Sequence, residues 1–584
     1  MVNHLYYGDN LPVLRESVAD ASVDLVYLDP PFNSNASYNV LFMGPGGTDS
    51  PAQIEAFDDT WHWTDTAEAA YGEVLQSGNR DAAELLRAMR VFLGENDMMA
   101  YLAMMTIRLL ELHRVLKDTG SLYLHCDPTA AHYLKLLMDA VFGCAMCQAC
   151  IAWKRTYARS DKMFGALSDT LLWYGKGEKV TRNMDAVIIP FTTDEIREKY
   201  PYEDERGRYM RGNLMGPSTS GETVGESGQA WKGCDPTRYG RHWSAPKTGR
   251  YARYLHDVLL PGYLDESGVH ARLDLLDAAG MIHWTQTGVP LLKRYCIPGQ
   301  GVVPGNIWTD IPPLGIIAKE RLGYPTQKPV ALLERIIAAS SNEGDLVLDP
   351  FCGCGTTVHA AEKLNRRWCG IDITHLAIGL IEKRLRDAFP RVAFTTHGVP
   401  QDIAGARDLA RRGRKEGRHY FEFEKWALSL INARPGTLSR RGADKGRGAG
   451  KGRGADKGRG ADKGIDGTIY FDRTRRALVS VKAGENVSIS MIRDLRGVIE
   501  REGAEIGIFL TLTPPTNPMV AEAAAAGQFR MEGFESAVPR IQIVTVEAAL
   551  ALRNRAVRLP LRRADTFKRA VREEDKTAQD KMDL

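Results

Sequence analysis

The stretch that decides the fold runs Leu346-Val347-Leu348-Asp349-Pro350-Phe351-Cys352-Gly353-Cys354-Gly355-Thr356-Thr357. A short apolar run leads into a loop with two alternating glycines, and the pattern predicts that a helix begins at Thr356. Short apolar runs are typical of buried parallel strands. Glycines between a strand and a helix start let a ligand approach the backbone closely. The stretch therefore predicts a strand, a ligand-binding loop and a helix of an α/β sheet.

The glycine loop excludes two common nucleotide-binding patterns. Val358 stands where the dinucleotide fingerprint needs its third glycine, and the Gly-Lys-Ser/Thr of a phosphate loop is absent. Asp372 follows Gly355 by 17 residues and ends the next predicted strand, where it is placed to accept ribose hydroxyls. These features fit S-adenosylmethionine, which has an amino-acid moiety and no pyrophosphate.

Strands and helices alternate on both sides of this stretch. Apolar runs at 5–7, 23–28 and 122–124 predict further strands, and the spacing of Leu102 to Leu116 predicts a helix that Thr119-Gly120 ends. Four predicted strands are followed by an aspartate, and strands of one parallel sheet end at one edge. If these four strands share a sheet, their acids line one rim; they are Asp9, Asp29, Asp349 and Asp372.

Asp29-Pro30-Pro31-Phe32 is the second chemically informative motif. Two successive prolines remove two N–H donors, so the turn presents acceptors only. Two acceptors that grip the N–H bonds of an exocyclic amine would aim its lone pair at a methyl donor, and Phe32 is predicted to stack on the extruded base. The alternative interpretation is a rigid corner between a strand and a turn.

Taken together, the motifs resemble the β-class of S-adenosylmethionine-dependent DNA amino-methyltransferases. The resemblance covers about 1–180 and 320–390. It implies a Rossmann-like α/β methyltransferase sheet in permuted motif order, with an inserted target-recognition region. The motifs that carry it are Gly8-Asp9-Asn10-Leu11, Asp29-Pro30-Pro31-Phe32, Ser168 to Tyr174, Tyr324-Pro325-Thr326-Gln327-Lys328-Pro329, Asp349 to Thr357 and Gly370-Ile371-Asp372.

The resemblance also implies roles for individual residues. Asp29, Pro30, Pro31 and Phe32 would be catalytic, with Asp29 and Phe32 gripping the target amine of double-stranded DNA. An aspartate at the first position favours adenine N6, and cytosine N4 stays the alternative. No metal is expected in this half. The implied cofactor-binding residues are Asp9, Thr326, Gln327, Lys328, Pro329, Asp349, Phe351, Gly353, Gly355, Thr356, Thr357 and Asp372.

Residues 419–550 resemble the Mrr-type branch of the PD-(D/E)xK nucleases, through Gly464 to Gly467 and Val479 to Lys482. The resemblance implies Mg²⁺ at Asp466, a polarising Lys482 and a helix acid at Glu424. Ser480 departs from the family, because a glutamate or glutamine is usual there and a hydroxyl is a weaker ligand for a hard cation. Two interpretations stay open: an active endonuclease, or an inactive DNA-binding module.

The predicted organisation divides the chain into a methyltransferase catalytic half (1–180), an irregular target-recognition insert (181–320) and a cofactor-binding half (321–395). A charged linker (396–418), the nuclease-like domain (419–550) and a charged tail (551–584) follow. A Gly-Ala-Asp-Lys-Gly-Arg repeat occupies 442–465 and is predicted to be flexible.

The composition is that of an ordinary globular protein: 584 residues, 44% hydrophobic, 26% charged and a net charge of +3. No run approaches 18 apolar residues and nine cysteines are few, so we expect no membrane span and a cytoplasmic location. The spacing of Cys144, Cys147 and Cys150 is compatible with a metal site, although it also fits a helix end that runs into a strand. A homodimer stays open, and no obligate protein partner is expected.

Overall fold

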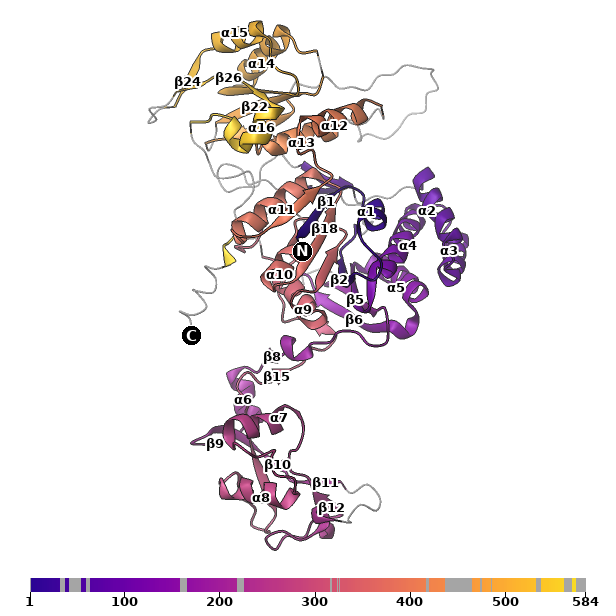
Figure 1. Ribbon diagram of the computed structural model, residues 1–584, viewed down its shortest axis with the longest axis vertical. Coiled ribbons are helices and arrows are strands. Elements are labelled where there is room, and N and C mark those ends of the chain that lie inside the picture. Colours follow the sequence, from indigo (N-terminus) through magenta and orange to yellow (C-terminus); the bar gives the residue numbers. More distant parts are fainter. Residues whose placement is uncertain are drawn as a thin grey trace. The chain divides into compact units, whose positions relative to one another are not determined.

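The computed structural model divides into two compact units, Met1–Asn183 with Gly305–Leu584, and Met184–Pro304 (Figure 1). The described residues are 2–31, 37–40, 54–58, 63–157, 165–217, 225–315, 318–322, 324, 326–415, 420–435, 465–472, 475–484, 486–531, 537–560 and 570–573.

The first unit contains a large sheet of nine described strands. Most neighbours are parallel, while β7 runs antiparallel to β5 and to β6. Their order across the sheet is β16 (Ile307–Trp308), β6 (Cys147–Lys154), β7 (Ser168–Gly175), β5 (Leu116–Cys126), β2 (Val23–Leu28), β17 (Leu346–Asp349), β18 (Arg367–Asp372), β1 (Asn3–Tyr7) and β19 (Phe394–His397).

Helices cover both faces of this sheet, which explains why its strands read as continuous apolar runs. In β2, Val26 and Leu28 belong to a buried cluster with α1, α2, α3, α4 and α5, while Leu25 and Tyr27 belong to a second cluster with α9, α10 and α11. The helices are α1 (Asn10–Ser17), α2 (Asp65–Gln76), α3 (Arg80–Leu93), α4 (Asp97–Val115), α5 (Pro128–Phe142), α9 (Val330–Ser340), α10 (Thr356–Lys363) and α11 (His375–Ala388).

The four strands that precede an aspartate are neighbours in this sheet. Their order is β2, β17, β18, β1, and every pairing among them is parallel. Leu348 pairs with both Val26 and Cys369, and Tyr7 pairs with Asp372. The prediction that these strands share a sheet is confirmed, and the four acids lie at its carboxyl edge.

The helix predicted through Leu116 ends one residue earlier, so its expected stop at Thr119-Gly120 is wrong. Leu116 has an extended backbone (φ −72°, ψ 138°) and pairs with Val23 as the first residue of β5. The register of β5 on β2 then shifts before Ser121. Tertiary pairing with β2 overrides the helical spacing of the leucines at this position.

The second unit has a core of its own and is less irregular than the sequence predicts. Aromatic residues that looked like loop residues are buried together, including Trp231, Trp243 and Tyr263. A four-stranded antiparallel sheet has the order β13 (Ile282–Trp284), β14 (Pro290–Tyr295), β10 (Gly207–Asn213) and β9 (Tyr202–Asp204). Shorter elements complete it: β8 (Ile189–Pro190), α6 (Thr193–Lys199), β11 (Met215–Pro217), β12 (Arg241–Trp243), α7 (Gly249–Tyr254), α8 (Val269–Ala278) and β15 (Gly301–Val302).

The C-terminal residues form a second, smaller sheet. Buried clusters on its two faces use alternate residues of β22, with Val479 on one face and Leu478 on the other. The strand order is β20 (Arg434–Pro435), β21 (Gly467–Tyr470), β22 (Arg476–Lys482), β23 (Ile506–Thr511) and β26 (Ile541–Thr545). Its helices are α13 (Tyr420–Leu430), α14 (Ile489–Glu502), α15 (Asn517–Ala525) and α16 (Val546–Leu552).

The expected charged linker at 396–418 contains a helix instead, α12 (Ile403–Lys415). Ala406 and Ala410 lie one turn apart and are buried in a cluster with Phe423 and Trp426, so a narrow alanine face suffices to pack this charged helix. The repeat at 442–464 lies outside the described residues. Among the described helices, none is long and apolar enough to cross a bilayer.

Candidate active site

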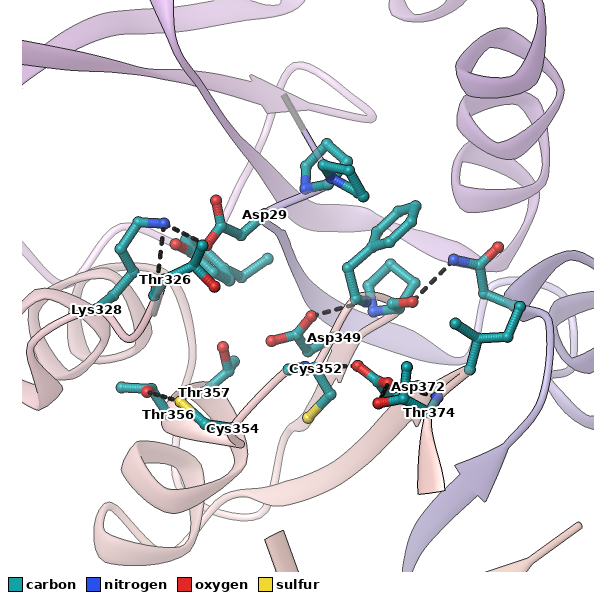
Figure 2. Close-up of a pocket in the computed structure, with 18 of the residues that line it drawn as sticks. Asp29, Thr326, Lys328, Asp349, Cys352, Cys354, Thr356, Thr357, Asp372 and Thr374 are labelled. Atoms are coloured by element: carbon teal, nitrogen blue, oxygen red, sulfur yellow. Dashed lines mark hydrogen bonds and ion pairs between the residues drawn. The ribbon is translucent and has the colours of Figure 1, made fainter. Parts of the chain in front are cut away.

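A cavity of about 340 Å³ opens at the carboxyl edge of the large sheet (Figure 2). Several separate segments line it, including Met104 and Arg108 of α4, and they come from parts of the chain more than three hundred residues apart. These segments contribute Gly8 to Asn10, Asp29 to Pro31, Thr326 with Lys328, Asp349 to Cys354, and Asp372 to Thr374. The two predicted motifs, the aspartate–proline corner and the glycine loop, therefore face one cavity.

Asp349 ends β17 and is almost fully buried, with 2% of its surface exposed. The backbone N–H of Phe351 donates to its Oδ1 at 3.0 Å, which shapes the turn into the glycine loop. Burial raises the pKa of the Asp349 carboxyl to about 7, because a charge is poorly solvated there. The nearby carboxylates of Asp29 and Asp372 act in the same direction.

Asp372 ends β18 and ties that strand to the glycine loop. The Gly353 N–H donates to its Oδ2 at 2.8 Å, while the N–H and Oγ1 of Thr374 each donate to Oδ1 at 2.8 Å. Burial raises the pKa of this carboxyl to about 6. Oδ1 already accepts two hydrogen bonds, but Oδ2 has a further lone pair, so the ionised group can still accept a ligand hydroxyl.

The glycine loop requires glycine at two positions. Gly353 and Gly355 have φ of +53° and +74°, which disfavours other residues. A Cβ on Gly355 would lie 2.8 Å from Cγ1 of Ile381, and a Cβ on Gly353 would lie 3.4 Å from the Tyr324 ring. The bare backbone of Gly353 thus forms part of the cavity wall, a surface that suits a closely held nucleoside.

Asp29 is engaged on one side only. The Lys328 ammonium donates to Oδ2 of Asp29 and also lies 3.5 Å from the carbonyl oxygen of Thr326 (Figure 2). Oδ1 of Asp29 is buried and has no hydrogen-bond partner within the described part of the chain. A buried carboxylate oxygen without a donor is unfavourable, so a ligand that donates a hydrogen bond to Oδ1 would stabilise the corner.

Asp9 is held by an arginine that the sequence did not reveal. Arg108 on α4 is buried and donates through Nη2 to Asp9 Oδ1 at 2.8 Å and through Nε to Asn10 Oδ1 at 2.6 Å. Asn10 in turn donates to the carbonyl of Pro350 at 2.8 Å. The available signal was an arginine between Ile107 and Leu109, within the mostly apolar stretch of α4 from Met98 to Leu110.

Three predicted cofactor residues are not among those that line the cavity: Gln327, Pro329 and Gly355. Gln327 is buried and holds its own segment, accepting from the Leu322 N–H and donating to the Glu320 carbonyl, both at 2.7 Å. Thr356 and Thr357 line the cavity, and buried Arg384 donates to Thr356 Oγ1 at 3.1 Å. Phe32 lies outside the described residues.

A buried polar chain leads away from the cavity wall. Tyr27 lines the cavity, and its hydroxyl shares a hydrogen bond of 2.9 Å with Nδ1 of His125. Nε2 of His125 lies 3.1 Å from Asp169, whose other oxygen lies 3.1 Å from Arg155. The sequence pattern does not single out His125, because strand spacing does not reveal its partners on β2 and β7.

The C-terminal sheet brings three of its four predicted residues together. Asp466 Oδ2 accepts from Ser480 Oγ at 3.3 Å and from the Val481 N–H at 2.5 Å, and Nζ of Lys482 lies 4.0 Å away. Glu424 lies on α13 and is partly buried. The carboxylate of Asp466 is an oxygen donor of the kind that Mg²⁺ accepts.

The three clustered cysteines follow α5. Cys144 and Cys150 are exposed, Cys147 is partly buried, and all three are free thiols. No group of three His, Cys, Asp or Glu side chains suited to a metal ion occurs among the described residues.

The arrangement defines a class: an α/β enzyme whose glycine loop and strand-end acids face an aspartate–proline corner across one cavity. The DNA methylase family matches residues 23–383, more than half of the chain, and the chain belongs to that family. A restriction endonuclease family matches residues 441–534. The protein is therefore a DNA methyltransferase of the restriction–modification type that uses S-adenosylmethionine, with a C-terminal endonuclease-like domain.

Named relatives are similar over different parts of the chain. The type II methyltransferase M.EcaI of Enterobacter cloacae is 32% identical over 65% of this chain and 69% of its own length. The Mod subunit of the type III enzyme StyLTI of Salmonella typhimurium is 27% identical over 61% of this chain and 49% of its own. The DNA adenine methyltransferase YhdJ of Escherichia coli is 49% identical over 14% of this chain and 28% of its own.

Proposed function

We propose that this enzyme methylates the N6 amine of adenine in duplex DNA, with Asp29 as the residue that grips the amine. One observation carries the proposal: Asp29 lines the same cavity as the glycine loop, and its Oδ1 is buried without a donor among the described residues. An amine N–H would supply the missing donor. The prolyl carbonyls of the corner are further acceptors, and the prolines contribute no N–H donor.

The residues that would hold the cofactor line the same cavity as the aspartate–proline corner. S-adenosylmethionine supplies a methyl group on an already activated sulfonium. Asp372 would accept a ribose hydroxyl, Gly353 would present its bare backbone, and Asp349 and Asp9 would place negative charge beside a cationic ligand. Holding the two reactants in line carries most of the acceleration, an effect that reaches roughly 7–11 kcal/mol in well-oriented reactions.

Adenine is favoured over cytosine by two observations. The corner begins with aspartate, which is commoner in the adenine-N6 enzymes that the motifs resemble. The relative YhdJ is named a DNA adenine methyltransferase. Methylation of cytosine N4 is the alternative, since both amines offer two N–H bonds to the same acceptors.

Labelled S-adenosylmethionine incubated with duplex DNA, followed by nucleoside analysis, tests this proposal. We expect N6-methyldeoxyadenosine, and a loss of roughly 10- to 150-fold in rate for Asp29→Asn, since a hydrogen bond to a charged group contributes about 1.5–3 kcal/mol and 1.36 kcal/mol is tenfold. N4-methyldeoxycytidine as the product would overturn the choice of base. An undiminished rate in Asp29→Asn would remove Asp29 from catalysis.

A second proposed activity belongs to the C-terminal sheet. We propose Mg²⁺-dependent DNA cleavage there, with Asp466 as the metal ligand and Lys482 beside it. The proximity of Lys482 Nζ to Asp466 Oδ2, at 4.0 Å, favours it, as does the match to a restriction endonuclease family. Ser480 offers a hydroxyl where a stronger oxygen ligand is usual, so a non-cleaving DNA-binding module is the alternative.

A further inference from the structure

The second unit presents an exposed turn that the catalytic site does not use. A short 3-10 helix, η4 (Pro236–Tyr239), runs through Gly240 into β12. Every residue from Thr237 to Arg241 is exposed, and the Tyr239 ring has 53% of its surface exposed. Figure 1 shows β11 and β12 at the end of this unit opposite to β8 and β15, where the chain enters and leaves it.

The exposed turn stands on a rigid base. Trp243 of β12 is 2% exposed, contacts Trp231 edge to face at 5.9 Å, and donates through Nε1 to the Gln229 carbonyl at 2.8 Å. Asp235 accepts the Thr237 N–H at 2.9 Å, and Gly240 closes the turn in a left-handed conformation. An exposed aromatic ring on such a base loses little conformational entropy when a partner covers it.

The charge around this turn has one sign. Between Asp235 and Asp257 the chain carries five basic residues and no acidic one; they are Arg238, Arg241, Lys247, Arg250 and Arg253. Of these five residues, only Arg238 has an ion pair within the described part of the chain, at 3.7 Å from Asp235. By contrast, exposed Arg197 pairs with Asp194 at 3.3 Å on α6, a helix that also carries Glu195 and Glu198.

We propose that the turn from Thr237 to Arg241 is a DNA-contacting element of the target-recognition unit. The inference rests on DNA being the substrate. Tyr239 stacks on a base or sugar, and Arg238 and Arg241 contact phosphates on either side of it. An aromatic ring flanked by arginines suits nucleic acid, because stacking and phosphate contacts need these two chemistries side by side.

Anisotropy of a fluorescein-labelled 40-base-pair duplex, measured with the full chain over a salt series, tests this inference. We expect Tyr239→Ala to weaken duplex binding roughly tenfold. Arg238→Gln and Arg241→Gln should each reduce the slope of log K against log salt by about 1. The matched control is Arg197→Gln, which removes an exposed arginine that also lies three residues after an aspartate.

Binding of S-adenosylmethionine and the melting temperature should be unchanged in all four variants, which shows that they are folded. Turn variants with the same duplex affinity and salt slope as Arg197→Gln would overturn the inference. Methylation is scored separately on plasmid DNA. A wild-type protein that binds duplex without methylating it would contradict the proposed function and leave the result on the turn standing.

Discussion

At the scale of single residues, the informative pair is Asp29 and Lys328. The sequence pattern assigned Lys328 to the cofactor, while the structure places its ammonium against Asp29, with both side chains mostly buried. A cation at this position holds the Asp29 carboxylate in one orientation through Oδ2, which leaves Oδ1 for the substrate amine. Lys328 is thus better described as a positioning residue for Asp29.

Replacing Lys328 tests that role through a split in the kinetic constants. Lys328→Met should lower kcat by roughly 10- to 100-fold, because a charge-assisted hydrogen bond of about 1.5–3 kcal/mol is lost. The KM for S-adenosylmethionine should change little, and Lys328→Arg should recover part of kcat. Steady-state kinetics with the cofactor varied provide the measurement.

The matched control is Lys117→Met, which removes a lysine paired at 2.7 Å with Asp24, a residue of β2 that does not line the cavity. It should leave both constants unchanged. A raised cofactor KM with normal kcat in Lys328→Met would instead support the cofactor role that the sequence pattern predicted.

At the scale of elements, the function depends on strand ends. Two adjacent parallel strands, β17 and β18, end in carboxyls that are buried together, and burial raises the pKa of Asp349 to about 7 and that of Asp372 to about 6. Both carboxyls are therefore largely protonated at pH 5 and ionised at pH 8. Ionising them in the free protein costs stability progressively as pH rises from about 4 through 7.

The affinity for the cofactor should increase as these two carboxyls ionise, whereas the stability of the free protein decreases. A ligand that carries positive charge and donates ribose hydroxyls favours the carboxylates, so the affinity for S-adenosylmethionine should rise between pH 5 and 7.5 and then level off. Calorimetric titrations across this range would measure it. Asp349→Asn should remove the part of the rise near pH 7, and an identical profile in that variant would contradict the assignment.

At the scale of the whole molecule, two chemistries are encoded in one chain. The acids and glycines of the large sheet lie in one fold, and Asp466, Ser480 and Lys482 lie in another sheet with its own core. Because no residue is shared between these two sets, each activity should be removable without the other.

In the full chain with Mg²⁺, Lys482→Ala should abolish DNA cleavage and leave methylation within about twofold of wild type, since it removes only the group beside Asp466. Asp29→Asn should do the reverse, and EDTA should stop cleavage alone. Gel assays of plasmid cutting beside methyl transfer provide the measurement, with Arg496→Ala on α14 as an exposed control. Cutting that survives Lys482→Ala would exclude Lys482, and an intact wild-type plasmid would favour the DNA-binding alternative.

Features that depend on local sequence were predictable, and features that depend on distant partners were not. The runs at 23–28 and 346–349 were recognisable as strands because both faces are buried, so nearly every residue is apolar. The helix α12 was missed because its buried face consists of two alanines, Ala406 and Ala410, with Ile403 and Leu409 partly buried beside them in a charged segment. The end of α4 was misplaced because Leu116 fits a helix by spacing and a strand by pairing.

The sequence by itself determined the corner and the loop, since prolines withhold donors and glycines permit a left-handed backbone wherever they fold. Only the tertiary structure decided which distant groups meet them. Lys328 reaches Asp29 across 299 positions, and Arg108 reaches Asp9 across 99. The physical reason is that side-chain partners depend on strand order and helix packing, which short-range spacing does not encode.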